Sequence, residues 1–309
     1  MFLIQLSSAL SVGLIAEVGP ATTSWLRLLM GGLIFIAIAR PKLRSIRRDD
    51  ALPLIGLGAA SALMSVAFLA AVDRIPLGTA VAIEFLGPLT VAAIRSHSRR
   101  ALAWPFLALA GVVLLTEPWH GAVDLGGIAF ALLAGVGWGS YILLTQRVGD
   151  RFPGISGLAV TIPIAAVCSA VVGVPGLVAN FEWRFLLIAL GLAVLAPVLP
   201  FWLEMSALRR MTPAAFGTLM AVEPAVGMLL GAIVLGQLPS AIQLTGVALV
   251  VLAGAAAQRG GSREVAGDPD VAPLSPEHLE DPDDPDRPSN PEPPAHPETP
   301  DADRPKDYE

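Results

Sequence analysis

The sequence predicts an all-α integral membrane protein, with ten transmembrane helices in two inverted five-helix repeats and a disordered C-terminal tail. The first observation is compositional: 54% of the 309 residues are hydrophobic and the mean hydropathy is +0.66, as in polytopic membrane proteins. The second is a series of apolar runs close to the roughly 20 residues that a helix needs to cross a bilayer. The third is the placement of cationic residues in alternate loops.

The apolar runs divide the chain into ten segments joined by short loops, so neighbouring segments are expected to form antiparallel hairpins. Their predicted ranges are 1–17, 21–39, 52–72, 77–94, 101–116, 125–147, 155–174, 185–207, 213–235 and 241–257. Compared with the sixth segment, the first is expected to be short by about two turns, at about 3.6 residues per turn.

The cationic residues predict the orientation of these segments. Two of them, Arg74 and Arg184, fall in loops on one side of the membrane. The other fourteen fall on the opposite side: Arg40, Lys42, Arg44, Arg47, Arg48, Arg95, Arg99, Arg100, Arg147, Arg151, Arg209, Arg210, Arg259 and Arg263. Because cytoplasmic loops are enriched in Lys and Arg, we expect a multi-pass protein of the plasma (inner) membrane with both termini in the cytoplasm.

A weak internal repeat is visible when the sequence is shifted by 136 residues. The shift superposes three identical residues, Ala71, Arg74 and Pro88 on Ala207, Arg210 and Pro224. Each half of the chain contains five segments. Because five is odd, the second set must insert upside down relative to the first. This predicts two repeats, residues 1–116 and 125–257, with the substrate path between them, as in many secondary transporters.

The last part of the chain has a different character. Residues 258–309 contain 12 of the 27 prolines, with 15 acidic and 5 basic residues, whereas residues 1–257 contain 11 acidic and 15 basic ones. A segment with so few apolar residues cannot bury enough surface to fold. We therefore expect a disordered, acidic and Pro-rich cytoplasmic tail; calcium or partner binding by the tail is a less favoured alternative.

Glu84 lies inside the otherwise apolar run from Leu77 to Ile94. A carboxylate at membrane depth costs several kcal/mol unless it is paired, protonated or hydrated, so it predicts a functional site. Pro88, four residues later, has no N–H for the carbonyl of Glu84, which predicts a helix break. Such breaks are tolerated where the backbone lines a cavity or is buried against other helices.

Arg27 is expected at the same depth as Glu84. Both lie six or seven residues into segments that enter from outside, so at about 1.5 Å per residue both sit roughly 10 Å below the surface. At equal depth the two could pair, and each would lower the cost of burying the other. A purely structural ion pair is the alternative to a substrate-binding role.

Two more carboxylates lie in the second half. Glu223 is expected about 15 Å deep, near the midplane, where Pro224 frees the carbonyl of Met220 and predicts a second helix break. Glu204 lies near the inner end of its segment, and pairing with Arg209 at the interface is the alternative to a role in the site. We therefore predict a site for substrate or protons at Arg27, Glu84, Glu204 and Glu223.

Several classes of function find no support in the sequence. Only His97 and His120 lie in the membrane body, on opposite sides, so no metal site is expected and a membrane-embedded enzyme is a remote alternative. Cys168 is the only cysteine, which excludes a disulfide within the chain. No Gly-rich Lys-Ser/Thr motif for nucleotides is present, so we expect no cofactor and no direct use of ATP. No cleavable signal peptide is evident.

Three stretches resemble motifs of one transporter family, in the same order. They are Ile75–Leu89 (IPLGTAVAIEFLGPL), Leu199–Leu208 (LPFWLEMSAL) and Phe216–Ala225 (FGTLMAVEPA). The sequence resembles the EamA branch of the drug/metabolite transporter superfamily, and especially its threonine/homoserine exporters, over about residues 5–257. It departs from that family in its short first helix and at Gln237, where members often have Glu in a Leu-Gly-Glu turn.

The resemblance implies ten helices in two inverted repeats and export of amino acids or similar small metabolites. We therefore predict a secondary-active exporter, with proton exchange as the candidate coupling. In it Arg27 attracts a carboxylate, and Glu84 or Glu223 attracts an amine or carries a proton. The alternative is another cargo, a cationic drug or an aromatic metabolite.

The expected partners are a small-molecule substrate and the lipid bilayer, with no nucleic acid and with monomer or homodimer left open. Aromatic side chains that could line the path are Trp25, Phe85, Trp138, Tyr141 and Trp202. Packing is the simpler explanation for any single one of them.

Overall fold

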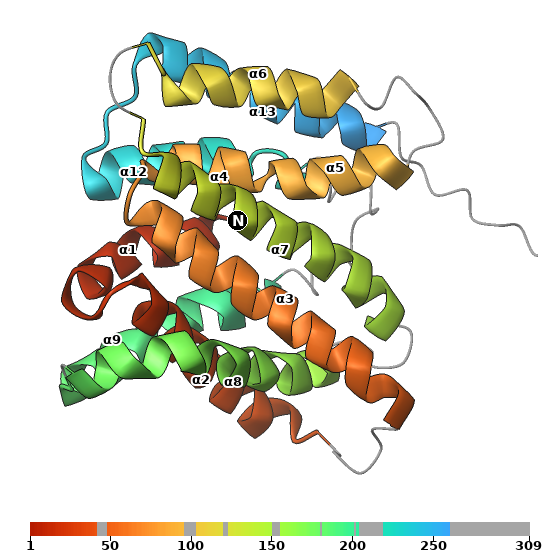
Figure 1. Ribbon diagram of the computed structural model, residues 1–309, viewed down its shortest axis with the longest axis vertical. Coiled ribbons are helices and arrows are strands. Elements are labelled where there is room, and N and C mark those ends of the chain that lie inside the picture. Colours follow the sequence, from red (N-terminus) through yellow and green to blue (C-terminus); the bar gives the residue numbers. More distant parts are fainter. Residues whose placement is uncertain are drawn as a thin grey trace, which may run out of the picture. The chain divides into compact units, whose positions relative to one another are not determined.

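The structure is a computed structural model that describes residues 1–41, 48–95, 103–119, 123–149, 155–179, 181–200, 202–203 and 219–259. All regular secondary structure within these ranges is helical, which confirms the predicted all-α class (Figure 1). Glu204, its candidate partner Arg209 and the predicted tail beyond Arg259 lie outside the described residues.

The helices follow the predicted segments. The first half contains α1 (Phe2–Val18), α2 (Pro20–Ala39), α3 (Arg48–Val72), α4 (Leu77–Glu84), α5 (Leu86–Arg95) and α6 (Ala103–Thr116). The second half contains α7 (Leu125–Gly149), α8 (Ile155–Ala179), α9 (Trp183–Ala193), the π-helical turn η3 (Val194–Val198), α12 (Glu223–Leu235) and α13 (Ala241–Arg259). Each of the ten predicted apolar segments thus contains helix. The predicted difference in length is present too, since α1 has 17 residues and α7 has 25.

Five helical segments in the described part of the chain are long and apolar enough to cross a membrane. They are Pro20–Ala39, Asp50–Val72, Leu77–Arg95, Leu125–Thr145 and Ser156–Ala179. Shorter apolar helices are Phe2–Val18, Ala103–Thr116, Trp183–Val198, Glu223–Leu235 and Ala241–Ala257. The chain is therefore an apolar helical membrane protein, while ten crossings and the inverted repeat remain predictions.

The helix break predicted at Glu84 is present. The chain leaves the helix between α4 and α5 at Phe85, and the next helical bond runs from Leu89 N–H to the Phe85 carbonyl at 3.3 Å. The freed carbonyl of Glu84 lies against Gly135 of α7, where a Cβ would be only 2.9 Å from its oxygen. The unpaired backbone is therefore buried against a neighbouring helix, one of the two environments expected to tolerate it.

A second break occurs at the other predicted proline. Helix α12 begins at Glu223, directly after a turn at residues 221 and 222, and Pro224 occupies its first turn. Proline suits this position because the first N–H groups of a helix have no partner within the helix. Glu84 thus ends one helix and Glu223 begins another.

Helices of the first half pack mainly against helices of the second. Helix α2 lies along α8, α4 along α12, and α6 along α13, while α3 contacts both α7 and α8 (Figure 1). Glycines allow the close approaches: a Cβ on Gly78 of α4 would come within 2.8 Å of Met228 in α12. Small residues serve this purpose in membranes, where close packing replaces the hydrophobic effect.

Helix α4 is buried along its whole length, from Leu77 to Glu84. It contacts α3, α6, α7 and α12, which explains why its sequence is apolar on every side. The side-chain oxygen of Gln237, in the turn after α12, accepts a hydrogen bond from the Leu77 N–H at 3.0 Å. The start of α4 is thereby fixed to the end of α12, and Glu84 is held at the opposite end of α4.

Candidate functional site

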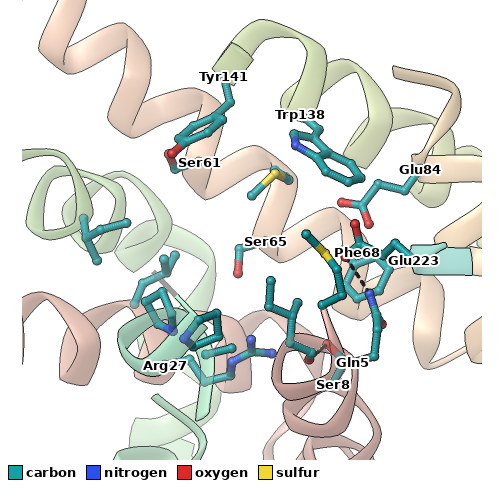
Figure 2. Close-up of a pocket in the computed structure, with 18 of the residues that line it drawn as sticks. Gln5, Ser8, Arg27, Ser61, Ser65, Phe68, Glu84, Trp138, Tyr141 and Glu223 are labelled. Atoms are coloured by element: carbon teal, nitrogen blue, oxygen red, sulfur yellow. Dashed lines mark hydrogen bonds between the residues drawn. The ribbon is translucent and has the colours of Figure 1, made fainter. Parts of the chain in front are cut away.

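A cavity of about 250 Å³ lies between the helices of the two halves (Figure 2). Its walls come from α1, α2, α3 and α4 in the first half, and from α7, α8, η3 and α12 in the second. Ligand pockets typically measure about 300–1,000 Å³, so this cavity suits a small metabolite better than a drug-sized molecule.

Three of the four predicted site residues line this cavity. Arg27, Glu84 and Glu223 are buried, with only 9%, 7% and 4% of their surface exposed. Glu84 and Glu223 interact electrostatically and point toward one another at one side of the cavity, whereas Arg27 lies at the other side (Figure 2). The cavity therefore has a guanidinium group on one side and two carboxyl groups on the other.

The direct Arg27–Glu84 pair considered from the sequence is not formed. No ion pair joins these two side chains, both of which the structure describes. Equal depth along the membrane normal does not fix the direction in which each side chain points around its helix. Here Arg27 on α2 and Glu84 on α4 face one cavity from different walls.

Glu223 is oriented by the first helix. The side-chain amide of Gln5 in α1 donates a hydrogen bond to Glu223 Oε1 at 3.0 Å. Helix α1 is itself fixed by Ser7, whose hydroxyl donates to the carbonyl of Leu192 in α9 at 3.0 Å. A hydrogen bond from a buried amide stabilises a carboxylate that lipid could not solvate.

Arg27 has donors to spare. Its NH1 donates to Ser11 Oγ at 3.3 Å, and Ser11 in turn donates to the Ser7 carbonyl at 2.6 Å. Its buried Nε has no hydrogen-bond partner among the described residues. Since a guanidinium carries five N–H donors in a planar fork, Arg27 can bind a carboxylate in the cavity while keeping Ser11.

The remaining wall combines hydroxyl groups with apolar and aromatic surface. Hydroxyl groups come from Ser8 on α1, from Ser61 and Ser65 on α3, and from Tyr141 on α7. The larger apolar and aromatic side chains are Met64, Phe68, Trp138, Leu158 and Ile162. Polar groups in an apolar cavity fix the orientation of a ligand, and the apolar surface excludes water.

Sequence reasoning missed Gln5 and the serines of this site. A signal was present on α1, where Gln5, Ser8 and Ser11 recur every three residues and so share one face of the helix. Of the candidate aromatics, Trp138 and Tyr141 line the cavity, whereas Trp25 and Phe85 pack in the core and Trp202 is exposed. The described part of the chain contains no cluster of His, Cys, Asp or Glu suited to a metal ion.

An apolar helical chain with buried Arg and Glu side chains around a cavity between its helices has the architecture of a membrane transporter. Residues 125–256 match the EamA-like transporter family. Curated relatives extend the match over most of the chain. The threonine/homoserine exporter RhtA of Salmonella typhimurium (strain SL1344) is 36% identical over 271 residues, covering 87% of this chain and 90% of that protein. The protein of the same name from Escherichia coli (strain K12) is 38% identical over 257 residues, covering 81% and 85%. This chain belongs to the EamA-like transporter family, and it is a transporter rather than an enzyme.

Proposed function

We propose that this chain is a secondary-active exporter of small zwitterionic amino acids, threonine and homoserine among them, in the inner membrane. The observation that carries the proposal is the separation of charge in the cavity, with Arg27 on one side and Glu84 and Glu223 on the other. An amino acid carries a carboxylate and an ammonium group, so it is complementary to both sides at once. The relatives named as threonine/homoserine exporters support the same choice of cargo.

In this proposal each charged residue has a defined role. Arg27 binds the substrate carboxylate with the N–H groups that Ser11 does not use. Glu84 and Glu223 bind the ammonium group, and Gln5 keeps Glu223 directed at the cavity. The substrate carboxylate lowers the cost of burying Arg27, and the ammonium group lowers the cost of burying the two glutamates. Lipid alone could not solvate these charges.

Coupling to protons follows from the neighbouring carboxylates. Two ionised carboxylates that face each other repel, and either a proton or the substrate ammonium group relieves that repulsion. Proton and substrate then compete for one pair of side chains. A proton entering from outside displaces the amino acid, and its release inside allows the next one to bind, which gives exchange.

The proposed architecture has ten crossings in two inverted repeats, residues 1–116 and 125–257, with both termini and the tail of residues 258–309 in the cytoplasm. The packing supports it, because the pairs α2–α8, α4–α12 and α6–α13 each join a helix to its counterpart in the other half. In the same scheme α7 is the counterpart of α1, and α9 is the counterpart of α3. The contact α3–α7 in one direction therefore corresponds to the contact α1–α9 in the other, and both are present. A twofold relation between the halves produces this pattern.

A larger cargo, such as a drug, is the competing proposal. The aromatic surface of Phe68, Trp138 and Tyr141 suits an aromatic metabolite, whereas the cavity volume disfavours drug-sized molecules. Proteoliposomes containing the full chain decide between them: labelled threonine, homoserine and phenylalanine are loaded inside, and efflux is measured with and without a pH gradient. We expect gradient-dependent efflux of threonine and homoserine; efflux of phenylalanine alone would contradict the proposed cargo.

A further inference from the structure

Buried hydroxyl groups in this protein usually donate to their own helix. Ser8, Ser11, Ser61, Thr161 and Ser169 each donate to the carbonyl four residues earlier, at 2.6–3.1 Å. This is the ordinary way for Ser and Thr to satisfy a hydroxyl group inside a helix. Such residues have no hydroxyl hydrogen left for a ligand.

Ser65 of α3 differs from these residues. Its Oγ accepts a hydrogen bond from the buried Ser24 of α2 at 2.9 Å. The two hydroxyl groups share this single hydrogen bond, and apart from each other they have no hydrogen-bond partner among the described residues. With Ser24 as the donor, the Ser65 oxygen is held by a neighbouring helix and the Ser65 hydrogen remains available.

Ser65 also occupies the part of the wall where the substrate side chain would lie. It lines the cavity, and Figure 2 shows it between Arg27 on one side and Glu84 on the other. An amino acid whose carboxylate is bound by Arg27 and whose ammonium is bound by the glutamates presents its side chain to a third wall. Helix α3 supplies such a wall, with Ser61 one turn before Ser65.

We propose that Ser65 is a specificity-determining residue that donates a hydrogen bond to the side-chain hydroxyl of the substrate. Ser61, which already donates to the Leu57 carbonyl, can only accept the hydroxyl hydrogen in return. The site then selects hydroxy amino acids over apolar ones of equal size, because valine would leave the Ser65 donor unpaired. This inference rests on the proposed export of amino acids and adds the chemistry that chooses among them.

The test compares threonine with valine, its isostere without the hydroxyl group. Proteoliposomes of the full chain exchange labelled homoserine, and unlabelled threonine or valine is added as inhibitor. In the wild type, threonine is expected to inhibit at lower concentration than valine. The variant Ser65→Ala should reduce that preference by about three- to tenfold, the effect of one neutral hydrogen bond, by weakening threonine alone.

The outcomes separate this inference from the function on which it rests. If the wild type does not exchange homoserine at all, the proposed function fails. If exchange persists and Ser65→Ala keeps the full preference for threonine, or weakens threonine and valine equally, Ser65 does not bind the side-chain hydroxyl and the inference is overturned.

Unchanged inhibition by valine in Ser65→Ala shows that the variant is folded. Ser169→Ala, which removes a buried serine of α8 outside the lining residues, should keep the wild-type preference. Should Ser65→Ala abolish exchange, Ser65→Thr retains a hydroxyl group and should restore exchange with the wild-type preference. Loss of exchange in both variants overturns the inference.

Discussion

The side-chain amide of Gln5 donates to Glu223 Oε1 at 3.0 Å and joins α1 to α12 across 218 residues of sequence. The Gln5 oxygen has no hydrogen-bond partner among the described residues. An amide can present either its NH₂ or its oxygen by rotating half a turn, so Gln5 can donate to an ionised carboxylate or accept from a protonated one. One side chain can therefore serve both states that the proposed proton exchange requires of Glu223.

Removing the charge at Glu223 should reduce transport strongly without unfolding the protein. In Glu223→Gln the amide oxygen still accepts from Gln5, but the group no longer binds an ammonium ion or a proton. We expect efflux from proteoliposomes to fall at least about tenfold, as the loss of one charge-assisted hydrogen bond predicts. Glu17→Gln, at a half-exposed carboxylate paired with Arg184, is the matched control and should transport normally. Normal efflux from Glu223→Gln would mean that this carboxylate is structural.

The variant Arg27→Lys should weaken substrate binding. Lysine keeps the charge but loses the planar fork that can contact a carboxylate and Ser11 together. The substrate concentration for half-maximal exchange is expected to rise about tenfold. Arg184→Lys, at an exposed arginine, provides the comparison. Equal half-maximal concentrations in the two variants would exclude Arg27 as the carboxylate ligand.

The contact between α5 and α7 should not tolerate a methyl group. A Cβ at Gly87 would come within 2.0 Å of the Gly135 carbonyl oxygen, next to the backbone of Glu84. Gly87→Ala is therefore expected to destabilise the fold by about 1–3 kcal/mol. The measurement is the thermal unfolding temperature in detergent. Gly191→Ala in α9, where nothing lies within 4 Å of the added carbon, should unfold at or above the wild-type temperature.

The structure gives Gln237, where the resemblance to EamA transporters implies Glu, a role as acceptor for the Leu77 N–H. Gln237→Glu keeps that acceptor and adds a negative charge at the start of α4, where the helix dipole favours it. We expect unchanged or increased stability and normal transport. Gln237→Leu removes the acceptor and should cost about 1 kcal/mol in unfolding free energy. Loss of transport in Gln237→Glu would show that the neutral amide matters for function.

The predicted orientation can be measured with reporter fusions. Alkaline phosphatase, which is active only in the periplasm, should be inactive when fused after Gln258. The loops on the same predicted side of the membrane hold fourteen of the sixteen loop cations, which predicts the cytoplasmic side. A fusion after Asp73, on the predicted outer side, should be active. Activity after Gln258 together with silence after Asp73 would reverse the orientation.

The sequence could indicate where charged residues gather because lipid cannot solvate charge. That rule selected Arg27, Glu84, Glu204 and Glu223. The structure places Arg27, Glu84 and Glu223 around one cavity, and Glu204 lies outside the described residues. Their binding of substrate or protons stays a prediction. The prolines predicted where α4 ends and α12 begins, because a missing N–H has a local effect.

What the sequence could not supply was the direction of each side chain around its helix, and so Arg27 and Glu84 face different walls instead of each other. The serines were missed for another reason: a serine that bonds its own helix and one that binds a ligand look the same in sequence.

The pairing of α2 with α8 has a consequence for how the protein is made. Thr22 on α2 donates to the Gly173 carbonyl on α8 at 2.8 Å, across 151 residues. At a synthesis rate of about 5–20 residues per second, α2 leaves the ribosome roughly 8–30 seconds before its partner exists. During that interval Arg27 enters the membrane with no second half to enclose it. We therefore expect Arg27 of the nascent chain to stay in a hydrated or protein-lined site beside the insertion machinery until α8 has been synthesised and inserted.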